Sequence, residues 1–254
     1  MNVLVTAGGT SEAIDSIRSI TNYSTGRLGS TIADVFASNN AAVTYVYGTG
    51  ANMPSSKNIN PIPIVNVQEL TSTIEGLLEN HKYDCIIHSM AVSDFTPQAY
   101  MTLDDIVANI AAAISTQPQQ ELASTIKQAI LASRQPLSQG KISSQTQNLM
   151  LCLQPTTKVI KLIKSKQPET ILVGFKLLSS ATEGQLQQAA SEVLTQNSCD
   201  FVLANDLKNI NSHTHKAILY GKGGPIYSAT TKQEIAEIIY KSVTGVAQAR
   251  PQLR

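Results

Sequence analysis

Apolar runs alternate with amphipathic stretches along the first hundred residues. Short β-rich runs at 2–7, at 41–50 and at the start of 83–95 predict buried strands, the first two ending in glycine. Apolar residues recur at helical spacing over 30–40 and 67–81, which predicts a helix in each interval. The order strand, helix, strand, helix, strand predicts an α/β fold with a Rossmann-like, doubly wound, mostly parallel sheet.

The pattern changes after residue 101. Two helical stretches follow, at 103–117 and 121–134, and no strand is evident between residues 101 and 137. The rest of the chain predicts strands at 149–153, 170–178 and 199–206, helices at 157–167, 182–197 and 231–247, and a hairpin at 216–228. We therefore expect a single α/β nucleotide-binding domain over 1–254 with an irregular insertion or flap over roughly 98–145, whose conformation the pattern leaves open.

Composition narrows the class of protein. Nineteen basic and eighteen acidic residues give a net charge of +1, which argues against a nucleic acid or an anionic membrane as partner. No window approaches the ~18 apolar residues that a membrane span needs, and the N-terminus lacks the basic segment of a secretion signal. The three separated cysteines, Cys85, Cys152 and Cys199, are typical of buried reduced thiols. We expect a cytoplasmic protein.

Polar clusters follow several of the predicted strands. They begin near residues 7, 48, 89, 174 and 204. In an open parallel sheet, ligands bind outside the carboxyl ends of the strands. The convergence of these clusters therefore predicts a binding site at that edge of the sheet.

Gly8 and Gly9, followed by Thr10, end the first predicted strand. Glycine permits close approach of the backbone, and amides at the start of a helix bind phosphate. The same residues would also suit a tight turn into a capped helix, and their spacing is not G-x-G-x-x-G. Both interpretations stay open.

A second candidate phosphate cradle precedes the helix predicted at 30–40. It contains Ser24, Thr25, Gly26 and Gly29, with an arginine among them. A helix cap explains the serine and the threonine but not the two glycines and the arginine. Two such segments suit a triphosphate better than a dinucleotide. The second predicted strand also lacks the acidic residue that binds the ribose of a dinucleotide.

Other single residues allow more than one interpretation. Asp94 caps a turn or binds a ligand, and the same choice applies to Asn205 and Asp206. Lys141 follows a glycine in a polar loop, where most lysines are solvated. The histidines of the segment 213–215 are expected in a surface loop, because no third metal ligand lies nearby.

Five motifs occur in order along the chain. They are VLVTAGGTSEAIDSIRSITNYSTGRLG at 3–29, AVSDFTP at 91–97, GKISS at 140–144, VGFKLL at 173–178 and DFVLAND at 200–206. The series resembles the phosphopantothenoylcysteine synthetases of coenzyme A biosynthesis from residue 2 to about residue 225. The resemblance leads us to expect the stand-alone, bacterial-type form, and leaves open whether a separate decarboxylase associates with it.

The resemblance implies a two-step ligation. A nucleoside triphosphate activates the carboxylate of 4'-phosphopantothenate as an acyl-nucleotide and releases pyrophosphate. The amine of L-cysteine then attacks to give the amide. The family also implies Mg²⁺ and a homodimer with shared active sites. Most bacterial members use CTP and eukaryotic members use ATP.

The resemblance also assigns roles to matching positions. It implies that the nucleotide is bound by Gly8, Gly9, Thr10, Ser24, Gly26, Gly29, Phe175 and Asn205. Lys141 is expected in a mobile loop over the triphosphate, where its charge neutralises the departing pyrophosphate. Arg18 is expected to bind the substrate phosphate across the dimer interface. The pantothenate and the acyl intermediate are assigned to Asn22, Ala91 and Asp94, and the catalytic residues are Asn22 and Lys141.

Two other functions remain as alternatives. One is an NAD(P)-dependent oxidoreductase on a Rossmann sheet, against which the missing G-x-G-x-x-G and ribose-binding acid argue. The other is a catalytically silent nucleotide-binding relative, against which the joint presence of Arg18, Asn22, Asp94 and Lys141 argues. KISS and GFKLL depart from the KIKK and GFAAET of many synthetases, so the choice between CTP and ATP stays open. The ligands of magnesium and the residues that bind cysteine also stay open.

Overall fold

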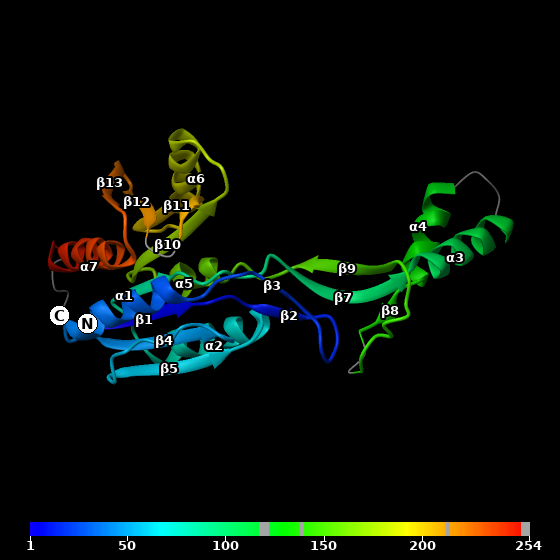
Figure 1. Cartoon of the computed structure of the whole chain (residues 1–254), viewed down its shortest axis with the longest axis horizontal. Coiled ribbons are helices and arrows are strands. Elements are labelled where there is room, and N and C mark those ends of the chain that lie inside the picture. Colours follow the sequence, from blue (N-terminus) through cyan, green and yellow to red (C-terminus); the bar gives the residue numbers. More distant parts are fainter. Residues whose placement is uncertain (117–121, 138–139, 212–213, 250–254) are drawn as a thin grey trace. The chain divides into compact units, whose positions relative to one another are not determined.

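The computed structural model describes residues 1–116, 122–137, 140–211 and 214–249 (Figure 1). The chain divides into two compact units. The first unit consists of Met1–Thr10, Asn22–Val92 and Thr157–Arg254, and the second of Ser11–Thr21 and Ser93–Thr156. The segment 98–145 lies inside the second unit.

The first unit is built on an eight-stranded sheet with the order β13-β12-β11-β10-β6-β1-β4-β5. The mutually parallel strands are β1 (Asn2–Ala7), β4 (Ala42–Gly48), β5 (Ile59–Ile64), β6 (Cys85–His88), β10 (Ile171–Leu178) and β11 (Phe201–Ile210). An antiparallel hairpin, β12 (His215–Gly221) and β13 (Gly224–Ala229), continues the sheet beyond β11. The Rossmann-like, doubly wound sheet and the terminal hairpin predicted from the sequence are confirmed.

The strand order reverses between β1 and β6. From β1 the chain builds outward through β4 and β5, and then returns to build β6, β10 and β11 on the other side of β1. Such a reversal is the topological switch point of an open α/β sheet, where the ligand crevice forms. The sheet therefore places the candidate site at the carboxyl ends of β1 and β6.

Helices cover both faces of this sheet. One face packs on α1 (Arg27–Ser38) and α7 (Lys232–Ala249) through strand residues such as Val3 and Val5. The other face packs through residues such as Leu4 and Ile86 on α2 (Val67–Asn80), α5 (Val159–Lys166) and α6 (Glu183–Gln196). Successive strand residues point to opposite faces, so strands covered on both sides are apolar throughout.

The second unit combines a small antiparallel sheet with two helices. Its elements are the hairpin β2 (Ser11–Ala13) and β3 (Ser19–Thr21), the sheet β8-β7-β9 with β7 (Phe95–Thr102), β8 (Gln135–Pro136) and β9 (Leu149–Pro155), and the helices α3 (Leu103–Thr116) and α4 (Leu122–Ala132). The two helices and β9 were predicted. The expectation that no strand lies between residues 101 and 137 was wrong, because β7 extends to Thr102 and β8 pairs with it. In β7 the buried residues Pro97, Ala99 and Met101 alternate with more exposed ones. This alternation is hard to recognise in the sequence, because Pro97 and Gln98 are not typical strand residues.

One open alternative and one expected boundary at the start of the chain were also wrong. No helix follows Gly8 and Gly9, because the chain enters β2 and β3 before α1 begins. Helix α1 begins at Arg27 rather than at residue 30, so Gly29 lies in its first turn instead of preceding it. Among the described residues, no helix combines the length and the apolar character needed to cross a bilayer.

Candidate functional site

Glycine backbones gather at the carboxyl ends of β1 and β4. A Cβ at Gly8 would lie 2.7 Å from Cβ of Ala51, and one at Gly26 would lie 2.9 Å from the same atom and 3.2 Å from the amide nitrogen of Gly8. A Cβ at Gly48 would overlap the carbonyl oxygen of Gly9. Side chains other than hydrogen do not fit here, so these backbone segments pack directly against one another and form a glycine cluster of Gly8, Gly9, Gly26 and Gly48.

The N-terminus of α1 lies at this glycine cluster. Its N-cap, Gly26, has a φ of 68°, in the left-handed region that favours glycine. Because glycine has no side chain, the N-cap residue itself provides no capping hydrogen bond. Ser24 and Thr25 instead accept hydrogen bonds within the loop, from the amides of Gly26 (3.4 Å) and Arg27 (3.5 Å). The start of a helix carries a partial positive charge and amides without intrahelical partners, which is the chemistry that binds phosphate.

Gly29 is explained by packing. It is buried, and a Cβ there would lie 2.5 Å from Cβ of Ala7 and 2.9 Å from Oγ of Ser89. The missing side chain lets α1 approach the end of β1 closely. A contact between its amide and a nucleotide stays a prediction.

Backbone hydrogen bonds join the segments that follow β1 and β6. The amide of Ala91 donates to the carbonyl of Gly8 (2.8 Å), and the amide of Thr10 donates to the carbonyl of Ala91 (3.1 Å). Thr10, which the resemblance assigns to the nucleotide, is fully buried, and its amide donates to the carbonyl of Ala91. The two central strands thus continue side by side past their ends.

Asn22 lies at this junction. Its Nδ2 donates to the carbonyl oxygen of Val92 at 2.9 Å. Its own carbonyl oxygen lies against Cα of Gly9 so closely that a Cβ on Gly9 would overlap it. The structure therefore brings together Gly9, Asn22 and Ala91, and their roles toward nucleotide and substrate stay predictions. Val92 was missed, because a contact through a backbone carbonyl leaves no mark in residue type.

Thr6 and His88 support the same junction from within the sheet. Oγ1 of Thr6 lies 3.0 Å from Nδ1 of His88 and accepts the amide of Met90 at 3.3 Å, and Oγ of Ser89 donates to the carbonyl of Thr6 at 2.6 Å. Burial lowers the pKa of His88 to about 4, so its ring is neutral at physiological pH. Sequence reasoning missed both residues because they lie inside strands.

Phe175 and Asn205 lie within β10 and β11, in agreement with the strands predicted at 170–178 and 199–206. The side chain of Asn205 is buried, with Nδ2 2.8 Å from Nε2 of His215. His215 is therefore a buried strand residue and not part of a surface loop, and His213 lies outside the described residues. Burial lowers the pKa of His215 to about 4.

Asp206 has a structural set of contacts. Its buried carboxylate accepts the amides of Ser180 (3.1 Å), Ala181 (2.6 Å) and Lys208 (2.9 Å). Burial raises the pKa of this carboxyl, but the three amides and the Lys208 charge outweigh it and leave the pKa below its ordinary value. Of the two interpretations left open for Asp206, the turn-capping one is confirmed.

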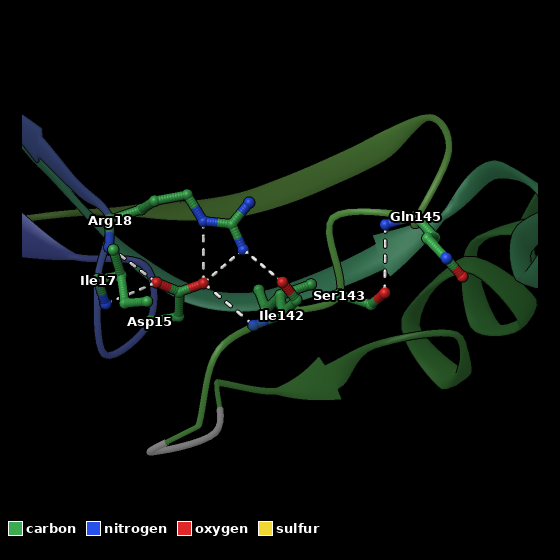
Figure 2. Close-up of polar contacts among 6 residues, drawn as sticks. All are labelled: Asp15, Ile17, Arg18, Ile142, Ser143 and Gln145. Carbon is green, nitrogen blue, oxygen red and sulfur yellow. Dashed lines mark hydrogen bonds and ion pairs between the residues drawn. The ribbon is translucent and has the colours of Figure 1, made fainter.

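Three of the expected site residues, Arg18, Asp94 and Lys141, belong to the second unit. Arg18 lies in the turn between β2 and β3, where its Nε donates to Oδ2 of Asp15 at 2.9 Å. Its Nη2 donates to the same oxygen and, at 2.8 Å, to the carbonyl of Ile142, next to Lys141 (Figure 2). Asp94 is exposed just before β7, and its carbonyl accepts the amide of Thr156 at 3.0 Å.

Asp15 organises this turn and was not singled out from the sequence. Its Oδ1 accepts the amides of Ile17 (2.9 Å) and Arg18 (2.8 Å), and its Oδ2 accepts the amide of Ile142 at 3.1 Å. The Arg18 guanidinium and these amides hold the pKa of the Asp15 carboxyl well below its usual range. The only signal for this role was an aspartate three residues before an arginine.

Within the described part of the chain, no group of three or more His, Cys, Asp or Glu side chains is arranged to hold a metal ion. Cys85, Cys152 and Cys199 are free thiols. Cys85 and Cys199 are buried as expected, and burial raises the pKa of Cys199 to about 12. Cys152 departs from the expectation, because it is only half-buried in β9.

The family model that matches the chain is the DNA/pantothenate metabolism flavoprotein C-terminal domain, over residues 1–104 and 107–246. The chain belongs to this family. The Coenzyme A biosynthesis bifunctional protein CoaBC of Thermococcus kodakarensis is 34% identical to it over 242 residues, which are 95% of this chain and 50% of that protein. The chain therefore spans about half the length of this relative.

Solved structures share the fold. The crystal structure of the DNA/Pantothenate Metabolism Flavoprotein from Streptococcus pneumoniae aligns with a TM-score of 0.81 and 36% identity, covering 97% of this chain and 99% of that one. A Cab2 mutant in complex with phosphopantothenate-cysteine aligns with a TM-score of 0.66 and 18% identity, covering 98% of this chain and 89% of that one. At this identity the second likeness concerns the fold alone.

Proposed function

We propose that the protein is a phosphopantothenate–cysteine ligase of coenzyme A biosynthesis. The observation that carries the proposal is the cluster of closely packed glycine backbones at the end of β1 and the start of α1, with Asn22 tied to the segment after β6. Membership of the pantothenate-metabolism family supports it. So does the complex of a protein of the same fold with phosphopantothenate-cysteine.

In the first step, a carboxylate oxygen of 4'-phosphopantothenate attacks the α-phosphate of CTP or ATP, and pyrophosphate leaves. The amides around Gly8 and Gly26 and the start of α1 bind the phosphates. Lys141 neutralises the charge that develops on pyrophosphate, and Arg18 binds the phosphate of the substrate. The base and ribose lie near Phe175.

In the second step, the amine of L-cysteine attacks the acyl carbon, the nucleoside monophosphate leaves and the amine loses a proton. An activated acyl group reacts readily once the amine is aligned with it. Asn22 provides this alignment, because its side-chain amide donates to the carbonyl of Val92 and its backbone packs closely against Gly9. Ala91 and Asp94 contact the acyl portion.

We further propose that the ligase is a cytoplasmic homodimer with shared active sites and uses Mg²⁺. Mg²⁺ is commonly bound by substrate phosphates, waters and one or two carboxylates, so its binding does not require a cluster of three protein ligands, and none is found among the described residues. When bound, the ion would neutralise part of the triphosphate charge.

The path of the chain after β1 disfavours the oxidoreductase alternative. A dinucleotide fold places its pyrophosphate at a helix that directly follows the first strand. Here the chain enters the β2–β3 hairpin, and α1 begins only at Arg27. The start of α1 is therefore presented together with the loop that carries Asn22.

The test is to incubate the protein with 4'-phosphopantothenate, L-cysteine, Mg²⁺ and either CTP or ATP, and to measure pyrophosphate and the amide product. Release of pyrophosphate that depends on 4'-phosphopantothenate, followed by amide formation, supports the ligase. No release with either nucleotide refutes it. The same assay compares CTP with ATP.

A further inference from the structure

Two segments of the second unit that are far apart in sequence meet at one backbone position. The turn between β2 and β3 contributes Asp15 and Arg18, and the loop before β9 contributes Ile142 (Figure 2). The amide of Ile142 donates to Oδ2 of Asp15 at 3.1 Å, and its carbonyl accepts Nη2 of Arg18 at 2.8 Å. The backbone of Ile142 is therefore held from both its donor and its acceptor side.

We call Asp15, Arg18 and the backbone of Ile142 the clasp. The side chain of Asp15 is fully buried, and that of Arg18 is 40% exposed. The side chain of Ile142 is also buried, at 5% exposure, whereas Lys141 beside it is exposed. The clasp thus anchors one residue and leaves the neighbouring lysine directed outward on an anchored backbone.

Asp15 also restrains the other charged residue. Its Oδ2 accepts Nε and Nη2 of Arg18, and Nη1 has no hydrogen-bond partner among the residues that the structure describes. A guanidinium whose one edge is paired with a buried carboxylate has a fixed plane and presents its other edge. One carboxylate therefore sets the orientation of Arg18 and the position of the loop that carries Lys141.

We propose that Asp15 is a positioning residue of the ligase, which aligns Arg18 and the Lys141 loop with each other through the backbone of Ile142. The inference rests on the proposed function for the roles of Arg18 and Lys141. Asp15 itself touches neither substrate. It fixes the plane of the Arg18 guanidinium and anchors the backbone beside Lys141, so that both residues are positioned before their ligands bind.

The variant Asp15→Asn tests the proposal. The carboxylate accepts backbone amides on one oxygen and the Arg18 and Ile142 donors on the other. The asparagine side chain has nearly the same shape, but in either orientation its NH₂ group would face hydrogen-bond donors instead of accepting from them. The clasp is therefore lost with little change in side-chain volume. A matched control is Asp105→Asn in the same unit, whose carboxylate accepts Nε2 of Gln135 at 3.0 Å.

The first readout is limited trypsin digestion of the protein without nucleotide. The bond between Lys141 and Ile142 is protected in the wild type, because the amide of Ile142 is hydrogen-bonded and its side chain is buried. Loss of hydrogen bonds to a charged group is expected to speed cleavage there roughly tenfold or more in Asp15→Asn. Cleavage after Lys127, in α4, and the Asp105→Asn control are expected to be unchanged.

The second readout is the pyrophosphate assay. Asp15→Asn is expected to raise KM for 4'-phosphopantothenate and to lower kcat by roughly tenfold or more each, because Arg18 and Lys141 both lose their alignment. Equal cleavage at Lys141 in the wild type and the variant overturns the proposal. So does equal acceleration at Lys127, because Asp15 would then stabilise the whole unit. An inactive wild type with the expected digestion pattern refutes the ligase but leaves the clasp in place.

Discussion

The close approach of Gly9 to Asn22 yields the sharpest prediction, for the variant Gly9→Ala. A Cβ on Gly9 would overlap the carbonyl oxygen of Asn22, and the two must separate by about 1 Å to reach ordinary contact. The backbone of Gly9 is also joined to Ala91. The displacement therefore falls mainly on the Asn22 loop.

A misplacement of about 1 Å in a positioning group reduces rate by roughly 100-fold. We expect kcat for amide formation to fall by that factor in Gly9→Ala. Overpacking of this kind costs about 1–3 kcal/mol of stability, which for a chain of this size lowers Tm by roughly 3–10 °C. The variant should thus stay folded at 25 °C while losing activity.

The assay combines amide formation under saturating substrates with a thermal melt. Gly76→Ala in α2 is the matched control, because a Cβ there meets nothing within 4 Å. It should keep wild-type kcat, and replacing a mid-helix glycine adds up to about 1 kcal/mol of stability. Wild-type kcat in Gly9→Ala would refute the view that this contact positions Asn22.

Three further outcomes are expected. Asn22→Asp should still release pyrophosphate but form little amide, because a carboxylate oxygen would face the carbonyl of Val92; a normal amide yield would remove Asn22 from its assigned role. Gly29→Ala should lower Tm by roughly 3–10 °C, because its Cβ would lie 2.5 Å from that of Ala7; an unchanged melt would contradict the packing explanation. Burial holds the pKa of His88 at about 4 in the folded state, against 6.5 for an exposed histidine. Between these two values the unfolded chain binds more protons than the folded protein does. The free energy of unfolding therefore falls as the pH falls from 6.5 toward 4, by up to about 1.4 kcal/mol per pH unit. Urea titrations of the wild type and His88→Gln at several pH values between 4 and 6.5 check this. If the free energy of unfolding changes equally with pH in the two proteins, the explanation is contradicted.

Much of the fold was predictable because its signals are local. Apolar strand runs and amphipathic helices each lie within a short window, and their order alone predicts a doubly wound sheet. The missed elements lack such a window. The β2–β3 hairpin has strands of three residues, and β7 carries Pro97 and Gln98 where alternation would be read.

The candidate site was predictable in its residue types but not in its contacts. The motifs pointed to glycines, Asn22, Arg18 and Lys141. The structure distinguishes Gly9, which gives room to the Asn22 backbone, from Gly29, which gives room to β1. It also shows that the amide of Thr10 is bound to Ala91.

By itself, the sequence determined the class of fold and predicted the sheet edge and the polar residues of the candidate site. Only the tertiary structure decided which backbones those residues hold. Asp15 meets Ile142 across 127 positions, and Asn22 meets Val92 across 70. Each of these bonds ends on a peptide group, which is the same in nearly every residue type, so the sequence carries no mark of it and folding alone brings it about.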